Sequence, residues 1–189
     1  MAHQPLDRAF IIEATKKWIE TVVIGLNLCP FASVPFQQKS IRFALTESTS
    51  KQKLLNTLHS ELSFLQQNSD IETCLLIHPQ ALINFSDYNQ FLQAAEDLLE
   101  DLDFAGEFQI ASFHPDYQFA GTMLNDAENY TNRSPFPMLH ILREASLNKA
   151  LQNYPNPEAI PQRNIERLQK MGVEEAQTML RSCLNYRSE

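Results

Sequence analysis

Hydrophobic residues recur along this chain with two different spacings, which predict an alternation of helices and short strands. Between positions 7 and 28, apolar side chains return every three or four residues, which is the period of an amphipathic helix. Short apolar runs bounded by polar residues instead indicate strands. We therefore expect helices at about 7–28, 50–67, 86–103, 137–151, 161–170 and 173–185, and strands at about 40–46, 73–77 and 108–113.

Capping residues and prolines set the expected helix boundaries. Asp7 is a suitable N-cap for the first helix, and Ser86 is a suitable N-cap for the third. Pro30 should end the first helix, because the residue before a proline is pushed out of the helical region. Residues 31–38 are then a loop. Pro137 favours a helix start, because proline suits the first helical turn.

The order of these elements predicts a single α/β domain over residues 1–189. Helices between short strands usually join parallel neighbours through right-handed crossovers. We expect a small, mostly parallel sheet of three or four strands with crossover helices and a helical C-terminal region, and a ferredoxin-like α+β arrangement is the alternative. The expected segments are an N-terminal helix and loop at 1–39, the strand and helix core at 40–113, a functional loop at 114–136 and C-terminal helices at 137–189.

The composition is typical of a globular protein with an excess of acidic groups. Hydrophobic residues make up 43% of the chain, and the formal net charge is −8. That charge argues against nucleic acid and against anionic membrane surfaces as partners, since both favour basic patches. No apolar run approaches the roughly 18 residues of a membrane span, and the N-terminus lacks the features of a signal peptide.

Cysteine and glycine usage indicates the state of the thiols and the kinds of cofactor to expect. The three cysteines, Cys29, Cys74 and Cys183, form no CxxC pair, which is typical of reduced thiols and predicts a cytoplasmic location. With only four glycines, the chain has neither a GxGxxG nor a P-loop sequence. We therefore expect no nucleotide cofactor bound in the usual way.

Groups that bind ligands or transfer protons are concentrated in the segment 113–144. A loop of this length within a compact domain is usually functional or disordered, and its aromatic and proline content argues against disorder. Two predicted strands also end alike, at His78 and His114, each followed by proline. If these strands are parallel, both histidines lie at the carboxyl edge of the sheet, where α/β proteins bind ligands.

His114 is the main candidate for proton transfer. Its ordinary pKa near neutrality suits a general acid or base, and Asp116 is placed to orient it or to bind a cation. A simple turn formed by the His-Pro-Asp sequence is the alternative. Cys29 is a candidate nucleophile, but its position at a helix C-terminus disfavours the thiolate. An inert, buried cysteine is therefore the alternative.

Arginine and amide side chains around the same loop predict a pocket for a small anion. Arg133 precedes a predicted helix N-terminus, where backbone N–H groups favour negative charge, and its guanidinium suits a carboxylate or phosphate. On the expected helix, His140, Arg143 and Glu144 share a face. The alternative for Arg143 and Glu144 is a structural pairing with the Asn-rich loop. The alternative for Arg163 is a position that faces solvent. The expected substrate-binding residues are Arg133, Asn132, Asn129, Arg143, Tyr117, His140 and Arg163.

Metal binding has weaker support in the sequence. His114 and Asp116, together with Asp126 or His140, could supply nitrogen and oxygen ligands. No HExxH or CxxC sequence accompanies them. We therefore expect neither a metal nor an organic cofactor.

Four segments of the chain resemble a bacterial family known only as a domain of unknown function. They are GLNLCPFA at 25–32, FHPDYQFA at 113–120, NYTNRSPFPMLH at 129–140 and the pair Arg163-Asn164. The resemblance covers nearly the whole chain and implies a bacterial cytosolic protein. It implies no particular activity, so no catalytic role is taken from it.

These residues lead to three functional hypotheses. In the first, the chain is an enzyme, a hydrolase or transferase, that holds a small carboxylate or phosphate substrate and performs its chemistry with His114, Asp116 and Cys29. In the second, the same pocket binds a small molecule without catalysis. The third is an aromatic surface for a protein partner, made of Phe31, Phe36, Tyr117, Phe119 and Phe136. The density of polar groups favours a pocket over an interface.

Overall fold

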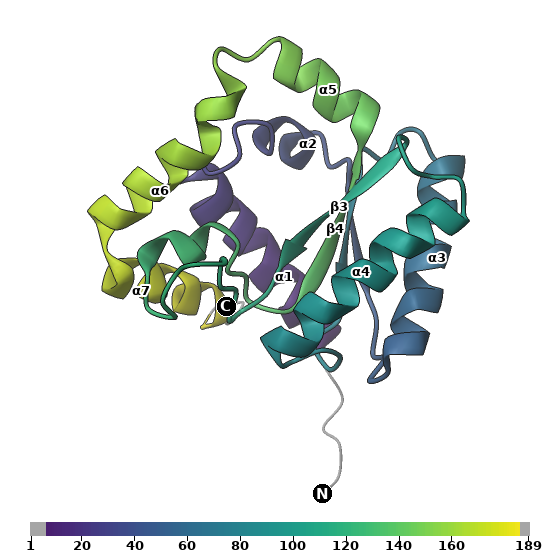
Figure 1. Ribbon diagram of the computed structural model, residues 1–189, viewed down its shortest axis with the longest axis horizontal. Helices are drawn as coiled ribbons and strands as arrows, with labels where there is room; N and C mark the ends of the chain where they lie inside the picture. Colours follow the sequence, from purple (N-terminus) through teal and green to yellow (C-terminus); the bar gives the residue numbers. More distant parts are fainter. Residues whose placement is uncertain (1–6, 186–189) are drawn as a thin grey trace, which may run out of the picture.

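The computed structural model describes residues 7–185, so the predicted domain limits at 1 and 189 lie outside it. Figure 1 shows a central sheet with helices on both of its faces. The helices are α1 (Arg8–Trp18), α2 (Ser33–Gln37), α3 (Lys51–Gln67), α4 (Phe85–Asp101), α5 (Glu144–Gln152), α6 (Ile160–Met171) and α7 (Val173–Leu184). The strands are β1 (Ile41–Leu45), β2 (Thr73–Ile77), β3 (Phe108–Phe113) and β4 (Met138–Arg143). The π-helical η1 (Ile19–Ile24) continues α1, and the short 3₁₀ segments are η2 (Ala127–Thr131) and η3 (Pro157–Ala159).

The four strands form a mixed sheet in the order β1-β2-β4-β3. β1 and β2 are parallel, whereas β4 lies antiparallel to both of its neighbours, β2 and β3. Consequently β1, β2 and β3 run in the same direction, with β4 inserted against them. An α/β domain with C-terminal helices is confirmed. A mostly parallel sheet is not confirmed, because only the β1–β2 pair is parallel, and that pair does not fit an all-antiparallel ferredoxin-like sheet.

β4 occupies a segment for which the sequence predicted a helix. Its side chains alternate between the two faces of the sheet, with His140 on one face and Leu139 and Ile141 on the other. Apolar residues on both faces suit a central strand that is buried between two neighbours, and this pairing overrides the proline signal. The prediction of a helix from Pro137 is therefore wrong for 138–143, and the helix begins only with α5.

The other predicted elements agree with the structure within a few residues, apart from two local differences. The N-caps Asp7 and Ser50 accept hydrogen bonds from backbone N–H groups in the first turns of α1 and α3. The helix α4 is capped by Asn84 rather than by Ser86. The segment 31–38, expected to be a loop, contains the short helix α2.

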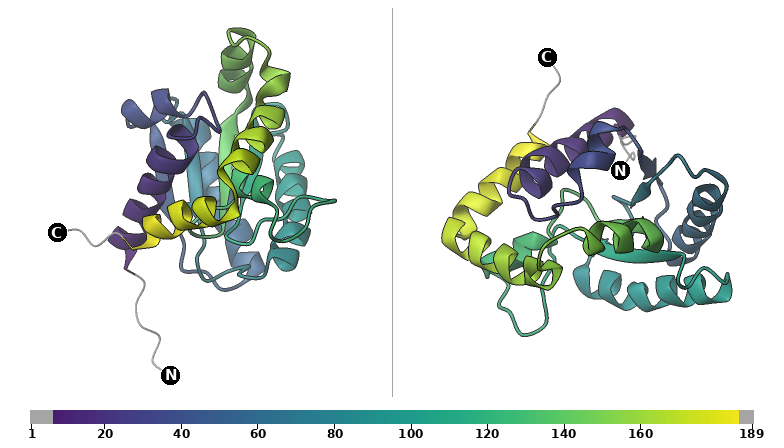
Figure 2. Two further views of the ribbon diagram at one scale, coloured as in Figure 1. Left: turned by 90° about the vertical axis from the view of Figure 1, so that its left-hand side faces the viewer. Right: turned by 90° about the horizontal axis from the view of Figure 1, so that it is seen from above.

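Two apolar cores lie on the two faces of the sheet. On one face, α3 and α4 pack against Leu76, Leu139 and Ile141. On the other face, α1, η1, α6 and α7 pack around Leu75 and Ile77, and Figures 1 and 2 show the resulting layers. In the described part of the chain, no helix combines the length and the apolar composition needed to cross a membrane.

Candidate functional site

The carboxyl edge of the sheet brings together the two histidines that follow β2 and β3. The His78 ring stacks on Tyr88 with ring centroids 5.8 Å apart, and the His114 ring lies 5.1 Å from the same tyrosine. Both histidines are fully buried. The two strand ends therefore meet at one edge of the sheet, as their sequences indicated, even though β4 lies between β2 and β3.

Both ring nitrogens of His114 are engaged within the protein. Nδ1 accepts a hydrogen bond from the backbone N–H of Asp116 at 3.0 Å, so the proton is on Nε2, which donates to the Leu82 carbonyl at 3.1 Å. Burial lowers the pKa of His114 and favours the neutral ring. His114 thus fastens the loop after β3, and Asp116 contacts it through its backbone rather than its carboxylate. A role of His114 in proton transfer stays a prediction.

His78 is also held in a neutral form. Its Nδ1–H donates to the Ala81 carbonyl at 3.0 Å. Its Nε2 is the one buried side-chain nitrogen or oxygen in residues 7–185 that has no hydrogen-bond partner. Burial lowers the pKa of His78 to about 4. A charge on this ring would be costly, because the hydrogen bond to Ala81 offsets only part of its desolvation.

Two asparagine side chains hold together the loop between β3 and β4. The buried side chain of Asn129 accepts from the Phe119 N–H at 3.0 Å and donates to the Met123 carbonyl at 2.8 Å. Asn132 donates to the Ser112 carbonyl at 3.0 Å. These amides satisfy backbone groups that the loop would otherwise leave unpaired. Substrate binding by Asn129 and Asn132 stays a prediction, and their contacts are those of loop supports.

Arg133 is buried inside the same loop, with 9% of its surface exposed. Its guanidinium donates to the carbonyls of Tyr117 at 3.2 Å and Leu124 at 2.7 Å, and lies 4.5 Å over the Tyr130 ring. Within the described chain, no carboxylate forms an ion pair with it. These contacts indicate that Arg133 supports the loop, and anion binding by this residue stays a prediction.

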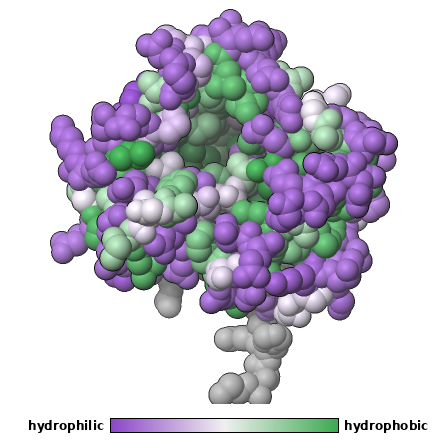
Figure 3. All heavy atoms as spheres, in the orientation of Figure 1, coloured by the Kyte–Doolittle hydropathy of each residue, from purple (hydrophilic) through white to green (hydrophobic). Residues whose placement is uncertain are grey.

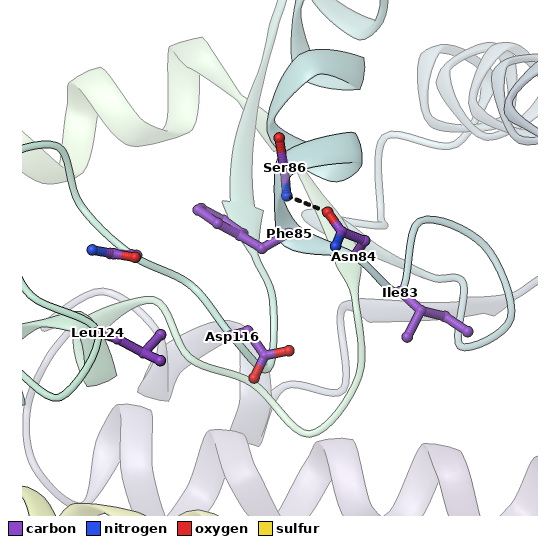
Figure 4. Close-up of a pocket in the computed structure, with 7 residues that line it drawn as sticks. Ile83, Asn84, Phe85, Ser86, Asp116 and Leu124 are labelled. Atoms are coloured by element: carbon purple, nitrogen blue, oxygen red, sulfur yellow. Dashed lines mark hydrogen bonds between the residues drawn. The ribbon is translucent and has the colours of Figure 1, made fainter.

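Two adjoining pockets lie outside this edge of the sheet. The larger one, of about 530 Å³, separates the start of α4 from the loop, and Figure 4 shows the Asp116 carboxylate in that space. The second, of about 380 Å³, is lined in part by Tyr117 and shares Phe85 and Gln118 with the first. Arg133 lines neither pocket, and Asp116 is the only charged residue in the two linings. The pockets therefore offer no positive partner to an anion.

Arg143 lies at the end of β4, on the face of the sheet opposite His140. Its Nε donates to the Ile71 carbonyl at 3.0 Å, and its Nη2 donates to the carbonyls of Leu65 and Asn68. These carbonyls belong to the end of α3 and the turn after it, where the helix dipole favours a cation. Arg143 therefore caps a helix. The expected helix face shared with His140 does not exist, because a strand alternates its side chains.

A second candidate site lies on the sheet face that carries His140. Figure 3 shows a hollow with a largely apolar wall in the region where Figure 1 places α2, α5, α6 and the strands β3 and β4. His140 is paired with Leu75, whose side chain belongs to the core that includes residues of α6 and α7. α5 has no fully buried residue, so this helix spans the region without packing tightly onto it.

His140 has one engaged and one open ring nitrogen. Thr73 donates its hydroxyl to the Ile141 carbonyl, so its oxygen accepts from Nε2–H of His140 at 2.7 Å. Nδ1 of His140 forms no hydrogen bond. It is not fully buried, since His78 Nε2 is the one buried side-chain nitrogen or oxygen without a partner in residues 7–185. Burial lowers the pKa of His140 to about 4. The ring is therefore neutral near pH 7, with the lone pair of Nδ1 free.

Cys29 lies in the turn after η1, on the same side of the sheet. Its thiol is half-buried, whereas those of Cys74 and Cys183 are buried. Burial raises the pKa of Cys29, and hydrogen bonds from the backbone at Phe31 and Ala32 act in the opposite direction. The net rise disfavours the thiolate, as the sequence indicated, but burial rather than a helix dipole is the main cause.

Arg163 is attached to the same turn. Its Nη1 donates to the Tyr154 hydroxyl at 3.2 Å, and its guanidinium lies 5.4 Å over that ring, which meets the Phe31 ring edge-on at 5.3 Å. The neighbouring Asn164 donates to the Leu28 carbonyl at 2.8 Å. These contacts fix α6 to the turn that carries the half-buried cysteine, while Arg163 itself stays exposed.

The chain matches a known protein family over most of its length. This family is described as a protein of unknown function (DUF1415), and the match covers residues 10–178. The chain belongs to this family. No curated protein and no solved structure matches it. Membership supplies no activity, so the function has to be argued from the geometry of the candidate sites.

The metal alternative finds no support in this geometry. Across residues 7–185, no group of three His, Cys, Asp or Glu side chains is placed to hold a metal ion. Asp126, one of the proposed ligands, accepts instead from the Met123 N–H at 2.7 Å. His114 uses both of its ring nitrogens in contacts within the protein.

The predicted site residues therefore fall into separate places. Cys29, His140 and Arg163 lie on the α6 side of the sheet. The residues at the carboxyl edge are His114, Asp116, Tyr117, Asn129, Asn132 and Arg133. Sequence reasoning missed Thr73 and Tyr154, the partners of His140 and Arg163. The Thr73–His140 contact joins residues 67 positions apart, and only the register of β2 on β4 could have indicated it.

Proposed function

We propose that the hollow on the His140 face of the sheet binds a small molecule that carries a carboxylate or phosphate, and that His140 exchanges a proton with it. The observation that carries this proposal is the open Nδ1 of His140, in a ring whose tautomer Thr73 fixes. A neutral imidazole with a free lone pair is suited to accept a hydrogen bond, and a bound anion would raise the pKa of the ring towards the range of a general base. The apolar wall would bury the body of the ligand.

Arg163 is the proposed contact for the anionic group. Its stacking on Tyr154 restricts the guanidinium, which can bind a carboxylate or phosphate through parallel N–H donors. Cys29 is the proposed nucleophile, since it is the half-buried thiol on this side of the sheet. Acid–base chemistry by a histidine together with a thiol nucleophile corresponds to a hydrolase or transferase.

A thermal-shift screen with carboxylates and phosphorylated metabolites tests this proposal. A ligand present at 100 times its dissociation constant stabilises the folded protein by about 2.7 kcal/mol. We expect a hit whose stabilisation is lost in His140→Gln and weakened in Arg163→Ala. The matched controls are His59→Gln and Arg167→Ala, because both side chains are exposed and Arg167 lies one turn from Arg163 on α6. Both controls should retain the hit.

Two results would contradict the proposal. One is a hit that survives unchanged in His140→Gln, because the ligand would then bind elsewhere. The other is a screen without any hit. For a confirmed ligand, one-dimensional NMR of the incubated mixture separates catalysis from binding. New product signals that need His140 indicate an enzyme, whereas an unchanged ligand indicates a binding protein.

A further inference from the structure

A groove at the carboxyl edge gathers most of the exposed large apolar side chains. It is formed by residues 83–86, 89, 116–122 and 124, which line the two adjoining pockets, and is called the Asp116 groove below. Among the described residues, the exposed large apolar side chains are Val34, Ile83, Met123 and Leu124. Three of these four belong to the groove or its rim. Clustered apolar side chains that face solvent mark sites of interaction.

The degree of exposure at this rim is high. Ile83 and Leu124 line the larger pocket with 66% and 56% of their surface exposed, and Met123, at 74%, immediately precedes Leu124. The aromatic residues expected to form a partner surface are not among the exposed large apolar side chains. The rim therefore carries no aromatic residue, while Tyr117 and Phe119 line the second pocket.

Asp116 gives the groove its charge. Asp116 is exposed, and its carboxylate forms no ion pair and accepts no hydrogen bond within residues 7–185. The hydrogen bond between Asp116 and the His114 side chain is donated by the backbone N–H of Asp116. Figure 4 shows the carboxylate in the open space between Leu124 and the start of α4. No other lining residue is charged. This carboxylate is therefore free to form an ion pair with a cationic group of a ligand.

We propose that the Asp116 groove binds a short segment of a partner protein in which an arginine or lysine is flanked by apolar residues. The basic side chain would pair with Asp116, and the flanking residues would cover Ile83 and Leu124. The site is shallow and its apolar rim projects into solvent, whereas small-molecule sites enclose most of their ligand. This geometry favours a peptide over a free amine. The groove is distinct from the hollow, so either proposal can fail without the other.

A peptide titration followed by NMR tests this inference. The probe is the acetylated, amidated peptide Leu-Ala-Arg-Ala-Leu, and the charge-reversed peptide carries glutamate in place of arginine. With methyl-labelled methionines, the exposed Met123 reports on the groove, and the buried Met138 is an internal reference. We expect the arginine peptide to shift the Met123 signal at millimolar concentration and to leave Met138 unchanged. Asp116→Asn should weaken binding about threefold, which is typical of one exposed ion pair.

The control variant is Asp70→Asn, which neutralises an exposed carboxylate on the turn before β2 and should leave binding unchanged. Three results would overturn the proposal. They are equal binding of the glutamate peptide, unchanged affinity in Asp116→Asn, and no Met123 shift with millimolar arginine peptide. A fourth result also overturns it: argininamide that binds as tightly as the peptide would make the groove a site for small amines.

Discussion

At the scale of single residues, Arg143, a candidate for ligand binding, makes hydrogen bonds within the framework. Its guanidinium satisfies carbonyls at the end of α3 and in the following turn, and those acceptors would be left without this partner in Arg143→Met. We expect this substitution to lower the free energy of unfolding by about 1–3 kcal/mol, because hydrogen bonds from a charged donor contribute about that much, although the Leu65 and Asn68 carbonyls keep their backbone donors. Urea denaturation measures the change.

Arg167→Met is the control for this prediction, since Arg167 is exposed on α6 and its substitution should change stability by less than about 0.5 kcal/mol. If Arg143→Met were as stable as the natural chain, the hydrogen bonds at the end of α3 would not be a stabilising cap.

Cys29 supplies a second prediction at this scale. It is half-buried, while Cys74 and Cys183 are buried, so iodoacetamide should modify Cys29 alone in the folded protein. Burial raises the pKa of this thiol, so we expect modification to be slower than that of free cysteine at neutral pH and to accelerate in alkaline solution. Mass spectrometry of the digested protein identifies the modified residue. Labelling of Cys74 or Cys183 before Cys29 would contradict the burial order.

At the scale of elements, the loop between β3 and β4 depends on Asn129. This side chain bonds the Phe119 N–H, the Thr122 hydroxyl and the Met123 carbonyl. In Asn129→Ala we expect hydrogen exchange at the Phe119 amide to become faster, because its acceptor is gone. Exchange measured by NMR should stay unchanged in β2, and Asn56→Ala, exposed on α3, should leave the loop protected. An equally protected Phe119 amide in Asn129→Ala would show that the loop has other supports.

The elements also show which features a sequence can predict. β2 and β3 were predicted with their observed bounds, because short apolar runs that end at His-Pro do not fit the pattern of a helix. The segment around His140 is apolar at both strand and helix spacing, and its state depends on pairing with β2 and β3, which lie far away in the sequence. The same limit applies to the site. Aromatic and proline content argued against disorder in the loop after β3, and the structure describes this loop throughout. Whether Asn129 and Arg133 satisfy carbonyls or a ligand is decided by tertiary contacts.

At the scale of the whole molecule, buried histidines link stability to pH. Burial lowers the pKa of His78 and of His140 to about 4, and lowers that of His114 as well. In the unfolded chain a histidine titrates at about 6.5, so between these values the unfolded state binds more protons than the folded state. The stabilising preference for the neutral rings is therefore fully present above about pH 6.5. It is lost progressively as the pH falls towards 4.

We therefore expect the free energy of unfolding to decrease between pH 6.5 and pH 4.5 by about 1.4 kcal/mol per pH unit for each of His78 and His140. Urea denaturation at a series of pH values measures this slope. His78→Asn retains a donor for the Ala81 carbonyl but cannot titrate. The free energy of unfolding of this variant should therefore fall less steeply with pH, by the contribution of one histidine. His59→Asn should keep the full slope, since His59 is exposed. An identical slope in His78→Asn would mean that the fold does not hold this ring neutral. The buried edge of the sheet would then tolerate a positive charge on His78 despite the cost of desolvating it.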